Sequence, residues 1–592
     1  MTVPERLAAA RDLMKQRGID AWIISGTDPH MSEYLPKHWY TREWISGFTG
    51  SYGKVVVTQN EAILSTDSRY FLQADEQLAG TGIQLMKDLR QPGDAPYISW
   101  LKKSLPEGSR VAINGLTIPV NKKRSLEASL GAKGITLDIT IDLVSELWDD
   151  RPSLPNSPAY ELMPEFAGTS RKEKLATLQN SLLEKEADGL VITALDELAW
   201  IFNLRGSDID YNPVFVGYGY IDREEAHLFV PEGKIDSALS EKLESEGIRI
   251  HGYDEFLSFV KNVEDKTLLI DPSRTSALLF ESVPKSCRIV EASSLANLLK
   301  SVKGPIEIEG MKKAHVRDGA AMVNFLYWLE NHLGKEKITE LTVDGKLREF
   351  RAEQDLFAGE SFHSIVGYAD HGAVVHYSVT EETDKEVLSE GFLLIDSGGQ
   401  YLDGTTDITR TVAVGPLSDQ QKRDFTLVLR GMIGLSLARF PEGTRGVALD
   451  ILARKPLWDN DMDYGHGTGH GVGHFLNVHE GPMSIRQDLN PEPIRLGQIL
   501  SNEPGIYKTG QYGIRTENMI LCVPGNESEF GQFLKFETLT RCPIDTSAVI
   551  PELLTTEERE WLNDYHHTVL QEVGPLVSTP VREWLTAKCA RI

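Results

Sequence analysis

The residues best suited to chemistry gather in the C-terminal half of the chain. Seven of the fifteen histidines fall between positions 363 and 479, far more than an even spread would place there. Histidines cluster where a protein binds a metal ion or transfers protons. The seven are His363, His371, His376, His466, His470, His474 and His479.

Four acids accompany these histidines, each beside a predicted strand. The apolar run from position 392 ends in Asp396, and Asp407 follows the turn-rich GGQYLDGTT at the head of ITRTVAV. A β-hairpin of this kind brings both carboxylates to one point. Glu503 lies beside a Pro-Gly turn in SNEPGIY, and Glu517 begins a strand in GIRTENMILCV. Strand ends fix the direction of a side chain well.

Taken singly, each acid could be a turn or solvated loop residue, but together they match a two-metal hydrolytic site. Two Asp, one or two His and two Glu form an oxygen-rich ligand set, and four carboxylates neutralise two divalent ions. A water molecule bridging such ions becomes hydroxide near neutral pH. The oxygen-rich set favours Mn²⁺, or another hard to borderline ion, over a thiolate zinc site.

The stretch GHGTGHGVGHFLNVH at 465–479 is interpreted as a metal-facing loop. Its glycines let the backbone approach a site closely, while histidine supplies nitrogen ligands. No GK[ST] follows, which argues against a phosphate loop. His479-Glu480 is followed by Gly481, so the HExxH motif of zincins is absent. The DSGG at Asp396 is also found in serine proteases, but no GxSxG elbow supports that alternative.

Composition excludes several other classes of protein. The formal charge of −26 disfavours binding to nucleic acid or to anionic membrane surfaces. The four cysteines form no CxxC pair, which indicates neither a zinc ribbon nor a disulfide framework. The sequence has no run of about 18 apolar residues, so neither a membrane span nor a signal peptide is predicted. A cytoplasmic location is expected.

The length of 592 residues predicts roughly three or four domains, and the chain opens with an α/β pattern. The Pro-rich RPSLPNSP at 151–158 marks a first linker, and a second lies near 303–305. Before and after the first linker the chain repeats the order helix, strand, GS-containing turn, with GIDAWIIS matching ADGLVITA. We infer a weak internal duplication. The predicted domains are 1–152, 153–305 and 306–592.

The motifs DSGGQYLDGTTDITRT, GHGTGHGVG with NVHEGP, SNEPGIY and GIRTEN resemble the signature of the pita-bread metallopeptidases, the family of creatinase, prolidase and methionine aminopeptidase. Within that family the similarity is greatest to the long, three-domain Xaa-Pro aminopeptidases. It extends to SEYLPKHWYTREWISGFTGSYG and NLRGSDIDYNPVF in the first two domains. The resemblance implies two related creatinase-like α/β domains followed by a pita-bread catalytic domain.

The resemblance also implies the site residues. Asp396, Asp407, His470, Glu503 and Glu517 would be the ligands of two divalent metal ions, with Mn²⁺ expected and Co²⁺ or Zn²⁺ as alternatives. His470 is chosen as the first histidine of the family's GHG[IV]G loop, although an HxxxH pair of His470 and His474 stays open.

Neighbouring residues receive roles from the same resemblance. His376 and His479 would contact the substrate and stabilise the tetrahedral intermediate, and His466 would line the pocket for the penultimate proline. Glu503 would also carry a proton to the leaving nitrogen. Arg515, two residues before Glu517 and so expected on the same strand face, would orient a ligand carboxylate.

The implied activity is release of the N-terminal residue from peptides with proline in second position, by attack of a hydroxide that bridges the two ions. An Xaa-Pro dipeptidase is the nearest alternative, and the chain's length and two extra domains disfavour a compact methionine aminopeptidase. Some proteins of this fold have lost the ligands and act as binding modules, whereas all five ligand positions are filled here. The resemblance implies a homodimer.

Overall fold

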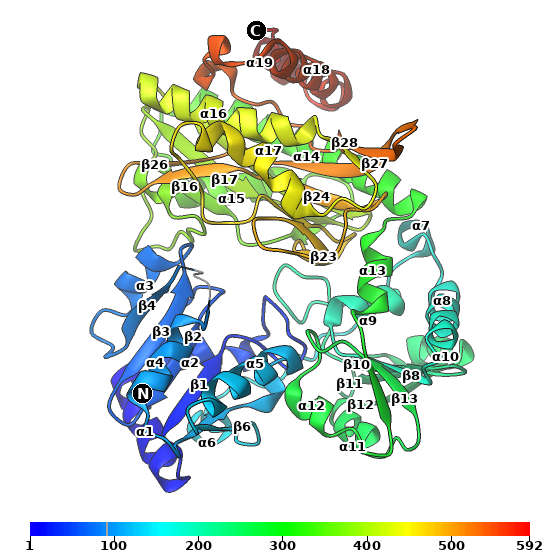
Figure 1. Cartoon of the computed structure of the whole chain (residues 1–592). Coiled ribbons are helices and arrows are strands. Elements are labelled where there is room, and N and C mark those ends of the chain that lie inside the picture. Colours follow the sequence, from blue (N-terminus) through cyan, green and yellow to red (C-terminus); the bar gives the residue numbers. More distant parts are fainter. Residues whose placement is uncertain (90–92) are drawn as a thin grey trace. The chain divides into compact units, whose positions relative to one another are not determined.

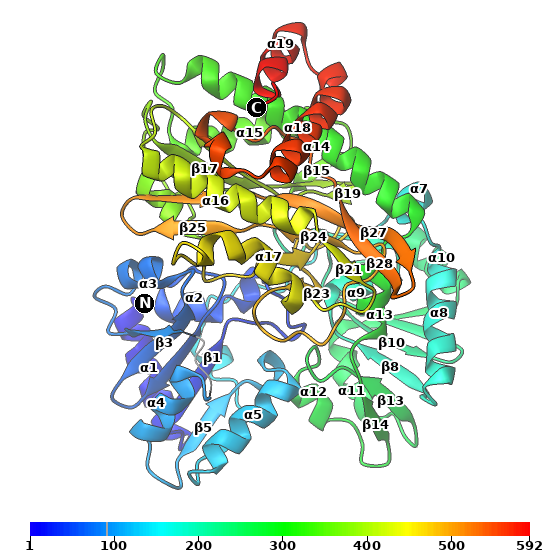
Figure 2. The ribbon, with the colours of Figure 1, turned by 45° about the horizontal axis from the view of Figure 1, so that its top comes forward.

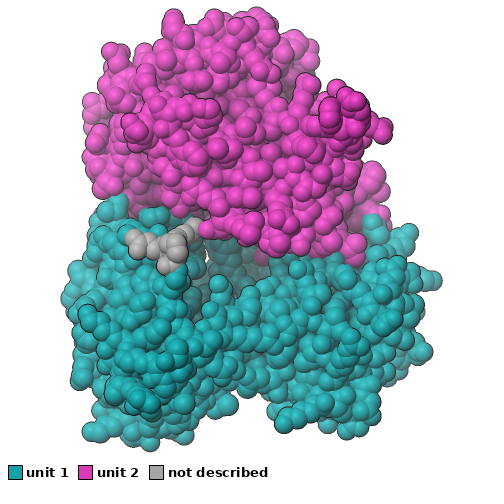
Figure 3. Space-filling view, in the orientation of Figure 1, with its two compact units in different colours: residues 1–162, 169–297 teal, residues 163–168, 298–592 magenta. Residues whose placement is uncertain are grey.

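The computed structural model describes residues 1–89 and 93–592. The chain divides into two compact units, shown in two colours in Figure 3. Unit 1 comprises residues 1–162 and 169–297, and unit 2 comprises residues 163–168 and 298–592. The two units are described separately because each has its own sheets and its own buried core.

The first half of unit 1 is a six-stranded sheet covered by helices. Helix α1 begins at a capping box between Thr2 and Glu5 and buries Leu7, Ala10 and Met14 along one stripe. All five residues of β1 are buried, as expected for a strand covered on both faces. The elements are α1 (Val3–Gln16), β1 (Ala21–Ser25), α2 (Thr41–Ser46), β2 (Lys54–Thr58), β3 (Ala62–Asp67), α3 (Phe71–Gln77), β4 (Gln84–Asp88), α4 (Pro96–Ser104), β5 (Arg110–Ile113), α5 (Val120–Gly131), β6 (Thr136–Asp138) and α6 (Val144–Leu147).

The second half of unit 1 repeats this plan. Helix α8 starts at the predicted capping box of Ser170 and Glu173 and buries Leu175, Leu178 and Leu182. The elements are β7 (Tyr160–Glu161), α8 (Arg171–Glu184), β8 (Gly189–Ile192), α9 (Leu195–Ile201), β9 (Leu204–Arg205), β10 (Tyr218–Asp222), β11 (Ala226–Val230), α10 (Ser237–Ser245), β12 (Ile248–Gly252), α11 (Phe256–Lys261), β13 (Thr267–Ile270), α12 (Ala277–Glu281) and β14 (Arg288–Glu291).

The two sheets of unit 1 have the same topology. Their strand orders are β4-β3-β2-β1-β5-β6 and β12-β11-β10-β8-β13-β14. In each sheet one inner strand, β1 or β8, pairs antiparallel with the next strand of that sheet along the chain and parallel with a later one, and the outer pairs match as well. Six strands in one order with one pattern of directions confirm the predicted duplication.

Unit 2 contains small antiparallel sheets and long helices. Its sheets are ordered β15-β18-β19, β16-β17-β20, β21-β28-β27-β24-β22-β23 and β25-β26. The helices are α7 (Pro164–Ala167), α13 (Leu295–Ser301, whose last residues belong to this unit), α14 (Pro305–His332), α15 (Glu340–Ala352), α16 (Asp419–Ser436), α17 (Gly446–Trp458), α18 (Thr556–Val573) and α19 (Thr579–Lys588). The strands are β15 (Phe357–Glu360), β16 (Ile365–Tyr368), β17 (Phe392–Ser397), β18 (Gly399–Tyr401), β19 (Gly404–Thr405), β20 (Ile408–Ala413), β21 (Arg439–Pro441), β22 (Gly469–Gly471), β23 (Glu480–Ile485), β24 (Ile499–Asn502), β25 (Gly505–Lys508), β26 (Tyr512–Arg515), β27 (Asn518–Ser528) and β28 (Gly531–Thr538).

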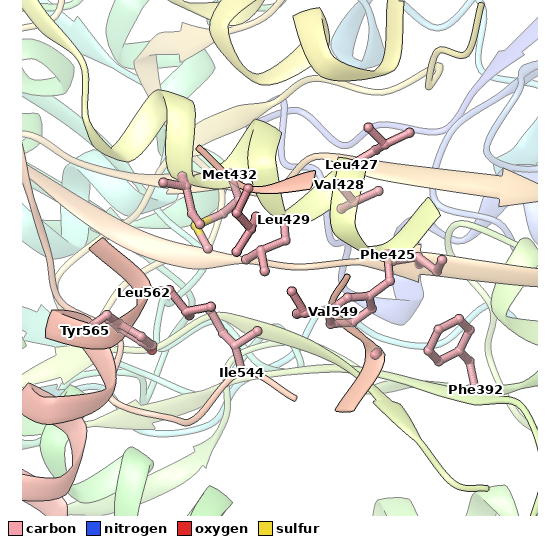
Figure 4. Packing of buried hydrophobic residues seen from close by; sticks show 14 of the residues in the cluster. Phe392, Phe425, Leu427, Val428, Leu429, Met432, Ile544, Val549, Leu562 and Tyr565 are labelled. Carbon is pink, nitrogen blue, oxygen red and sulfur yellow. The ribbon is translucent and has the colours of Figure 1, made fainter. Parts of the chain in front are cut away.

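Helices α16 and α17 run side by side across the strands of unit 2 (Figures 1 and 2). Their close approach depends on Gly431, because a Cβ there would lie 2.2 Å from the carbonyl oxygen of Ala453. Apolar side chains of α16 pack with Phe392 of β17 and with Leu562 and Tyr565 of α18 in one core cluster (Figure 4). Helix α18 is thereby held against the sheets that carry the predicted site.

Candidate metal centre

Two neighbouring strands bring the predicted aspartates together. Strand β17 pairs antiparallel with β20, and Asp396 lies opposite Thr409. Asp407 directly precedes β20, so its carboxylate is at the same end of this pair. The intervening GGQYLDGTT, expected as a turn, contains the short strands β18 and β19, which pair with each other. This small hairpin returns the chain so that Asp407 comes back beside Asp396.

The two glutamates meet in the same way in the six-stranded sheet. Glu503 follows β24 and Glu517 precedes β27, and these strands pair with Asn502 opposite Asn518. The backbone N–H of Glu517 donates to the carbonyl oxygen of Thr409 at 3.1 Å. This hydrogen bond connects the glutamate end of one sheet to the aspartate end of the other.

His470 on β22 completes the group. Its Nε2 lies 3.5 Å from Asp407 Oδ2 and 3.6 Å from Glu503 Oε1. Ligand atoms of Asp407, His470 and Glu517 all lie within 4.8 Å of one another. The preceding Gly469 permits this approach, because a Cβ there would lie 2.1 Å from the carbonyl oxygen of Ser501.

The orientation of His470 suits metal binding. Its Nδ1 lies 3.0 Å from the carbonyl oxygen of Gly471 and so carries the ring hydrogen. The Nε2 atom that faces the carboxylates is therefore an acceptor in the neutral ring, as required for a metal ligand. The backbone N–H of His470 donates to Ser501 Oγ at 3.0 Å, and the Ser501 hydroxyl donates to Glu503 Oε1 at 3.3 Å.

The carboxylates lie close together, and the protein alone does not offset their mutual repulsion and the cost of burying their charges. Burial, then the charge of Asp396, raises the pKa of Glu517 to about 8. Burial and the charge of Glu517 raise the pKa values of Asp407 and Glu503 well above their usual range. Among the described residues, Asp396 Oδ1 is buried without a hydrogen-bond partner. Four acids, one open carboxylate oxygen and one imidazole nitrogen fit divalent cations, whose charge would offset this repulsion.

Arg515 orients one of these carboxylates. Its Nη2 and Nε donate to Asp396 Oδ2 at 2.6 and 3.1 Å, and its Nε also lies 3.2 Å from Thr409 Oγ1. The expected common strand with Glu517 is wrong. Arg515 ends β26, paired with Gly505, and the chain then changes partner before β27 begins at Asn518.

His466 is linked to Arg515 through the hydroxyl of Tyr507. Its Nε2 is 2.8 Å from the hydroxyl of Tyr507, which accepts a hydrogen bond from Arg515 Nη1 at 2.6 Å. Its Nδ1 lies 2.8 Å from the carbonyl oxygen of Gly467. The half-buried His466 is therefore connected to Asp396 through Tyr507 and Arg515.

The remaining predicted histidines fall in different places. The half-buried ring of His479 lies edge-on to His470, with 4.4 Å between ring centroids. His376 is half-buried and follows Val375, whose carbonyl oxygen lies 3.5 Å from Arg515 Nη2. His474 is buried and lies outside the group formed by Asp407, His470 and Glu517, as Asp396 and Glu503 also do. The HxxxH pair of His470 and His474 therefore stays a prediction.

Three residues that hydrogen-bond to the predicted site residues were missed in the sequence analysis. Thr409 donates to Glu517 Oε2 at 2.8 Å, and Ser501 and Tyr507 make the contacts described above. Strand alternation could have found Thr409, since it lies two residues after Asp407 and so on the same face. For Ser501 and Tyr507 a single sequence offers no comparable signal, because their roles depend on how separate sheets pack.

Comparison with known proteins places this geometry in a family. Residues 309–524 match metallopeptidase family M24, and residues 532–592 match the C-terminal region of that family. Residues 6–144 and 150–307 each match a Creatinase/Prolidase N-terminal domain. Within the described residues, 1–89 and 93–592, we find no helix with the length and apolarity that crossing a bilayer requires.

Relatives match over nearly the whole chain. A probable Xaa-Pro aminopeptidase P from Coprinopsis cinerea is 39% identical, covering 98% of this chain and 97% of the relative. One from Laccaria bicolor is 40% identical, covering 99% and 93%. The crystal structure of an X-prolyl aminopeptidase from Caenorhabditis elegans, described as a cytosolic enzyme with a di-nuclear active site, covers 100% of both chains at 36% identity, with a TM-score of 0.95. The chain therefore belongs to metallopeptidase family M24, in its branch of Xaa-Pro aminopeptidases with two Creatinase/Prolidase N-terminal domains.

Proposed function

We propose that this chain is a metal-dependent exopeptidase that releases the N-terminal residue from peptides with proline in second position. The observation that carries the proposal is the convergence of His470 Nε2 with the carboxylates of Asp407, Glu517 and the half-buried Glu503, in a chain whose full-length relatives are named Xaa-Pro aminopeptidases. The ligands proposed are Asp396, Asp407, His470, Glu503 and Glu517.

The donor set supports Mn²⁺ as the ion, with Co²⁺ or Zn²⁺ as alternatives. Four of the five ligand residues offer oxygen, and the fifth offers an imidazole nitrogen, a combination typical of hard to borderline divalent ions. When bound, two such ions supply the positive charge that activates a water molecule as nucleophile and polarises the scissile carbonyl. Arg515 would hold Asp396 in the orientation that this ligand set needs.

Glu503 is the proposed proton carrier. It receives a hydrogen bond from Ser501 and lies 3.6 Å from His470 Nε2, so its carboxylate is inside the site. In the metal-free protein, burial and the charge of Glu517 raise its pKa well above the usual value. Glu503 would accept the proton of the attacking water and deliver it to the nitrogen of the leaving proline.

The histidines at the edge of the ligand cluster are proposed to act on the substrate. His479, beside His470, and His376, next to the carbonyl that Arg515 contacts, would donate hydrogen bonds to the oxygen of the tetrahedral intermediate. His466 would line the pocket for the penultimate proline. Its hydrogen bond with Tyr507 supports this role, because it fixes the direction of the ring.

The organisation of the protein is proposed in the same terms. Domains at 1–152, 153–305 and 306–592 agree with the repeated sheets and with the spans of the family matches. A homodimer is proposed for the assembly. A cytoplasmic location is proposed because the Caenorhabditis elegans relative is described as cytosolic.

The change Glu503→Gln tests the proposed chemistry. It should lower kcat by about 10²–10⁴-fold, because an amide cannot carry the proton while its oxygen still reaches the metal site. Release of free amino acid from a Mn²⁺-loaded sample is the measurement. Glu527→Gln, an exposed acid on β27, is the matched control and should leave kcat unchanged. Wild-type turnover in Glu503→Gln, with two ions bound per chain, would remove Glu503 from this role.

A further inference from the structure

A fully buried arginine, Arg410, lies beside the ligand cluster, and within the described residues its side-chain hydrogen bonds reach no ligand side chain. It is on β20, three residues after Asp407, and is 1% exposed. The five N–H groups of its guanidinium lie within hydrogen-bonding distance of six oxygens, all of them neutral, and Nη2 shares its two N–H groups among three of these oxygens. A buried guanidinium with acceptors for all of its N–H groups holds together the chain segments that supply these acceptors.

One side of this guanidinium holds the backbone around Glu517. Nη1 donates to the carbonyl oxygen of Glu517 at 2.6 Å and to that of Thr409 at 2.9 Å. Nη2 donates to Asn518 Oδ1 at 2.8 Å. The same Thr409 carbonyl accepts the N–H of Glu517, and the Thr409 hydroxyl donates to Glu517 Oε2. The position of this ligand is therefore set by Thr409 and Arg410 together.

The other side of the guanidinium is held by the C-terminal region, residues 532–592. Nη2 donates to the carbonyl oxygen of Cys542 at 2.9 Å and to the hydroxyl of Tyr565 at 2.8 Å, and Nε donates to the carbonyl oxygen of Pro543 at 3.1 Å. The Tyr565 hydroxyl donates its own hydrogen to Cys542 at 2.7 Å. Tyr565 lies on α18 within the core cluster that also contains Leu562 (Figure 4).

We infer that the C-terminal region has a positioning function in this enzyme: Tyr565 of α18 fixes the guanidinium of Arg410, and Arg410 fixes the metal ligand Glu517. Tyr565 and Arg410 are thus positioning residues rather than catalytic ones. The inference rests on the proposed function in one respect, since it takes Glu517 as a metal ligand. Outer partners of this kind commonly change metal affinity by about 10–100-fold when removed.

The test is a Co²⁺ titration of metal-stripped, full-length Tyr565→Phe, followed by visible absorption and by elemental analysis. The matched control is Tyr368→Phe, which also removes one buried hydroxyl, bonded at 3.1 Å to the carbonyl oxygen of Glu390, away from Arg410. The dissociation constant of the weaker Co²⁺ ion should rise about 10–100-fold in Tyr565→Phe and stay within about 2-fold of wild type in the control.

The outcomes separate this inference from the proposed function. If wild type binds two Co²⁺ ions and Tyr565→Phe binds them equally well, the inference is overturned and the proposed function stands. If wild type binds no Co²⁺, both are overturned. If Tyr565→Phe does not fold, Arg410→Lys decides: it keeps the charge but lacks the planar fork, so it should weaken Co²⁺ binding in the same way, and wild-type binding would overturn the inference.

Discussion

Three acids at the centre of this molecule, Asp407, Glu503 and Glu517, lie close enough that their charges oppose one another. Burial, and after it the charge of Asp396, raises the pKa of Glu517 to about 8. The protein offsets part of the repulsion locally: Thr409 donates to Glu517, and Arg515 donates to Asp396. The remaining imbalance is what a divalent ion would remove.

The metal-free protein should therefore lose stability as pH rises. The pKa of Glu517 is raised from 4.5 in the unfolded chain to about 8 in the folded one, so the folded state binds more protons between these values. The stabilisation is complete below about pH 4.5 and is lost as pH rises through about 8. Melting temperatures of chelator-treated protein, measured across this range, should fall with pH.

A saturating divalent ion is the control for that pH series. The bound ion requires deprotonated ligands, so the metal-loaded protein should gain in melting temperature over the metal-free protein as pH rises from 5 to about 8. A melting temperature of the metal-free protein that rises with pH across the same window would contradict the electrostatic account of Glu517.

At the scale of elements, the loop that carries His479 is anchored by an ion-pair cluster. Glu480, the first residue of β23, lies opposite Gly471 of β22. Its Oε2 accepts a hydrogen bond from Lys300 Nζ at 2.8 Å, and its Oε1 accepts one from Lys303. Lys303 lies two residues after the end of α13. All three charged groups are almost completely buried. The chain leaving α13 is therefore fastened beside the strand of His470.

Removing one partner of this cluster should be costly. Glu480→Gln leaves the ammonium groups of Lys300 and Lys303 buried without their shared carboxylate, and we expect a loss of about 3–5 kcal/mol in the free energy of unfolding, because uncompensated charge remains in the interior. Urea denaturation is the measurement. The matched control is Asp459→Asn, which breaks an exposed pair with Lys455 of α17 and should cost less than about 1 kcal/mol. Equal losses in the two variants would refute the structural importance of the cluster.

Helices and strands could be predicted from the sequence where their pattern depends on residues close together in the chain. The strand runs, the capping box at Ser170 and the repeated order of helix and strand all depend on neighbouring residues, and the strand-bounded acids could be placed by the same logic. The connections between distant segments could not be predicted. Arg410 and Tyr565 are 155 positions apart, and Lys303 and Glu480 are 177 apart. No periodicity relates such pairs, because only the packing of separate elements brings them together.

At the scale of the whole molecule, an apolar face of α17 supports the proposed homodimer. Ile451 and Trp458, seven positions apart and so on one side of the helix, are 47% and 42% exposed, and Leu452 beside them is 36% exposed. Contiguous exposed apolar surface can serve to bind another protein. A second copy of the chain is the occupant that the homodimer proposal requires.

Trp458→Asp should therefore shift the protein from dimer to monomer. A charge at the centre of an apolar interface opposes association, and about 2 kcal/mol or more of binding energy is expected to be lost with the aromatic ring. Sedimentation velocity gives the mass. Leu183→Asp, at an equally exposed leucine of α8, is the control and should leave the mass unchanged. A dimer that persists in Trp458→Asp, or a monomeric wild type, would contradict this assignment.

The most direct test of the central claim is a mass-spectrometric time course of products. Metal-stripped protein is resupplied with Mn²⁺ and given an Arg-Pro-Pro-type peptide, an Xaa-Pro dipeptide and a Met-Ala peptide in parallel. We predict metal-dependent release of only the first residue from the Arg-Pro-Pro-type peptide and no cleavage of the Met-Ala peptide. Cleavage confined to the dipeptide would indicate an Xaa-Pro dipeptidase instead, and absence of any cleavage with two ions bound would contradict the proposed function.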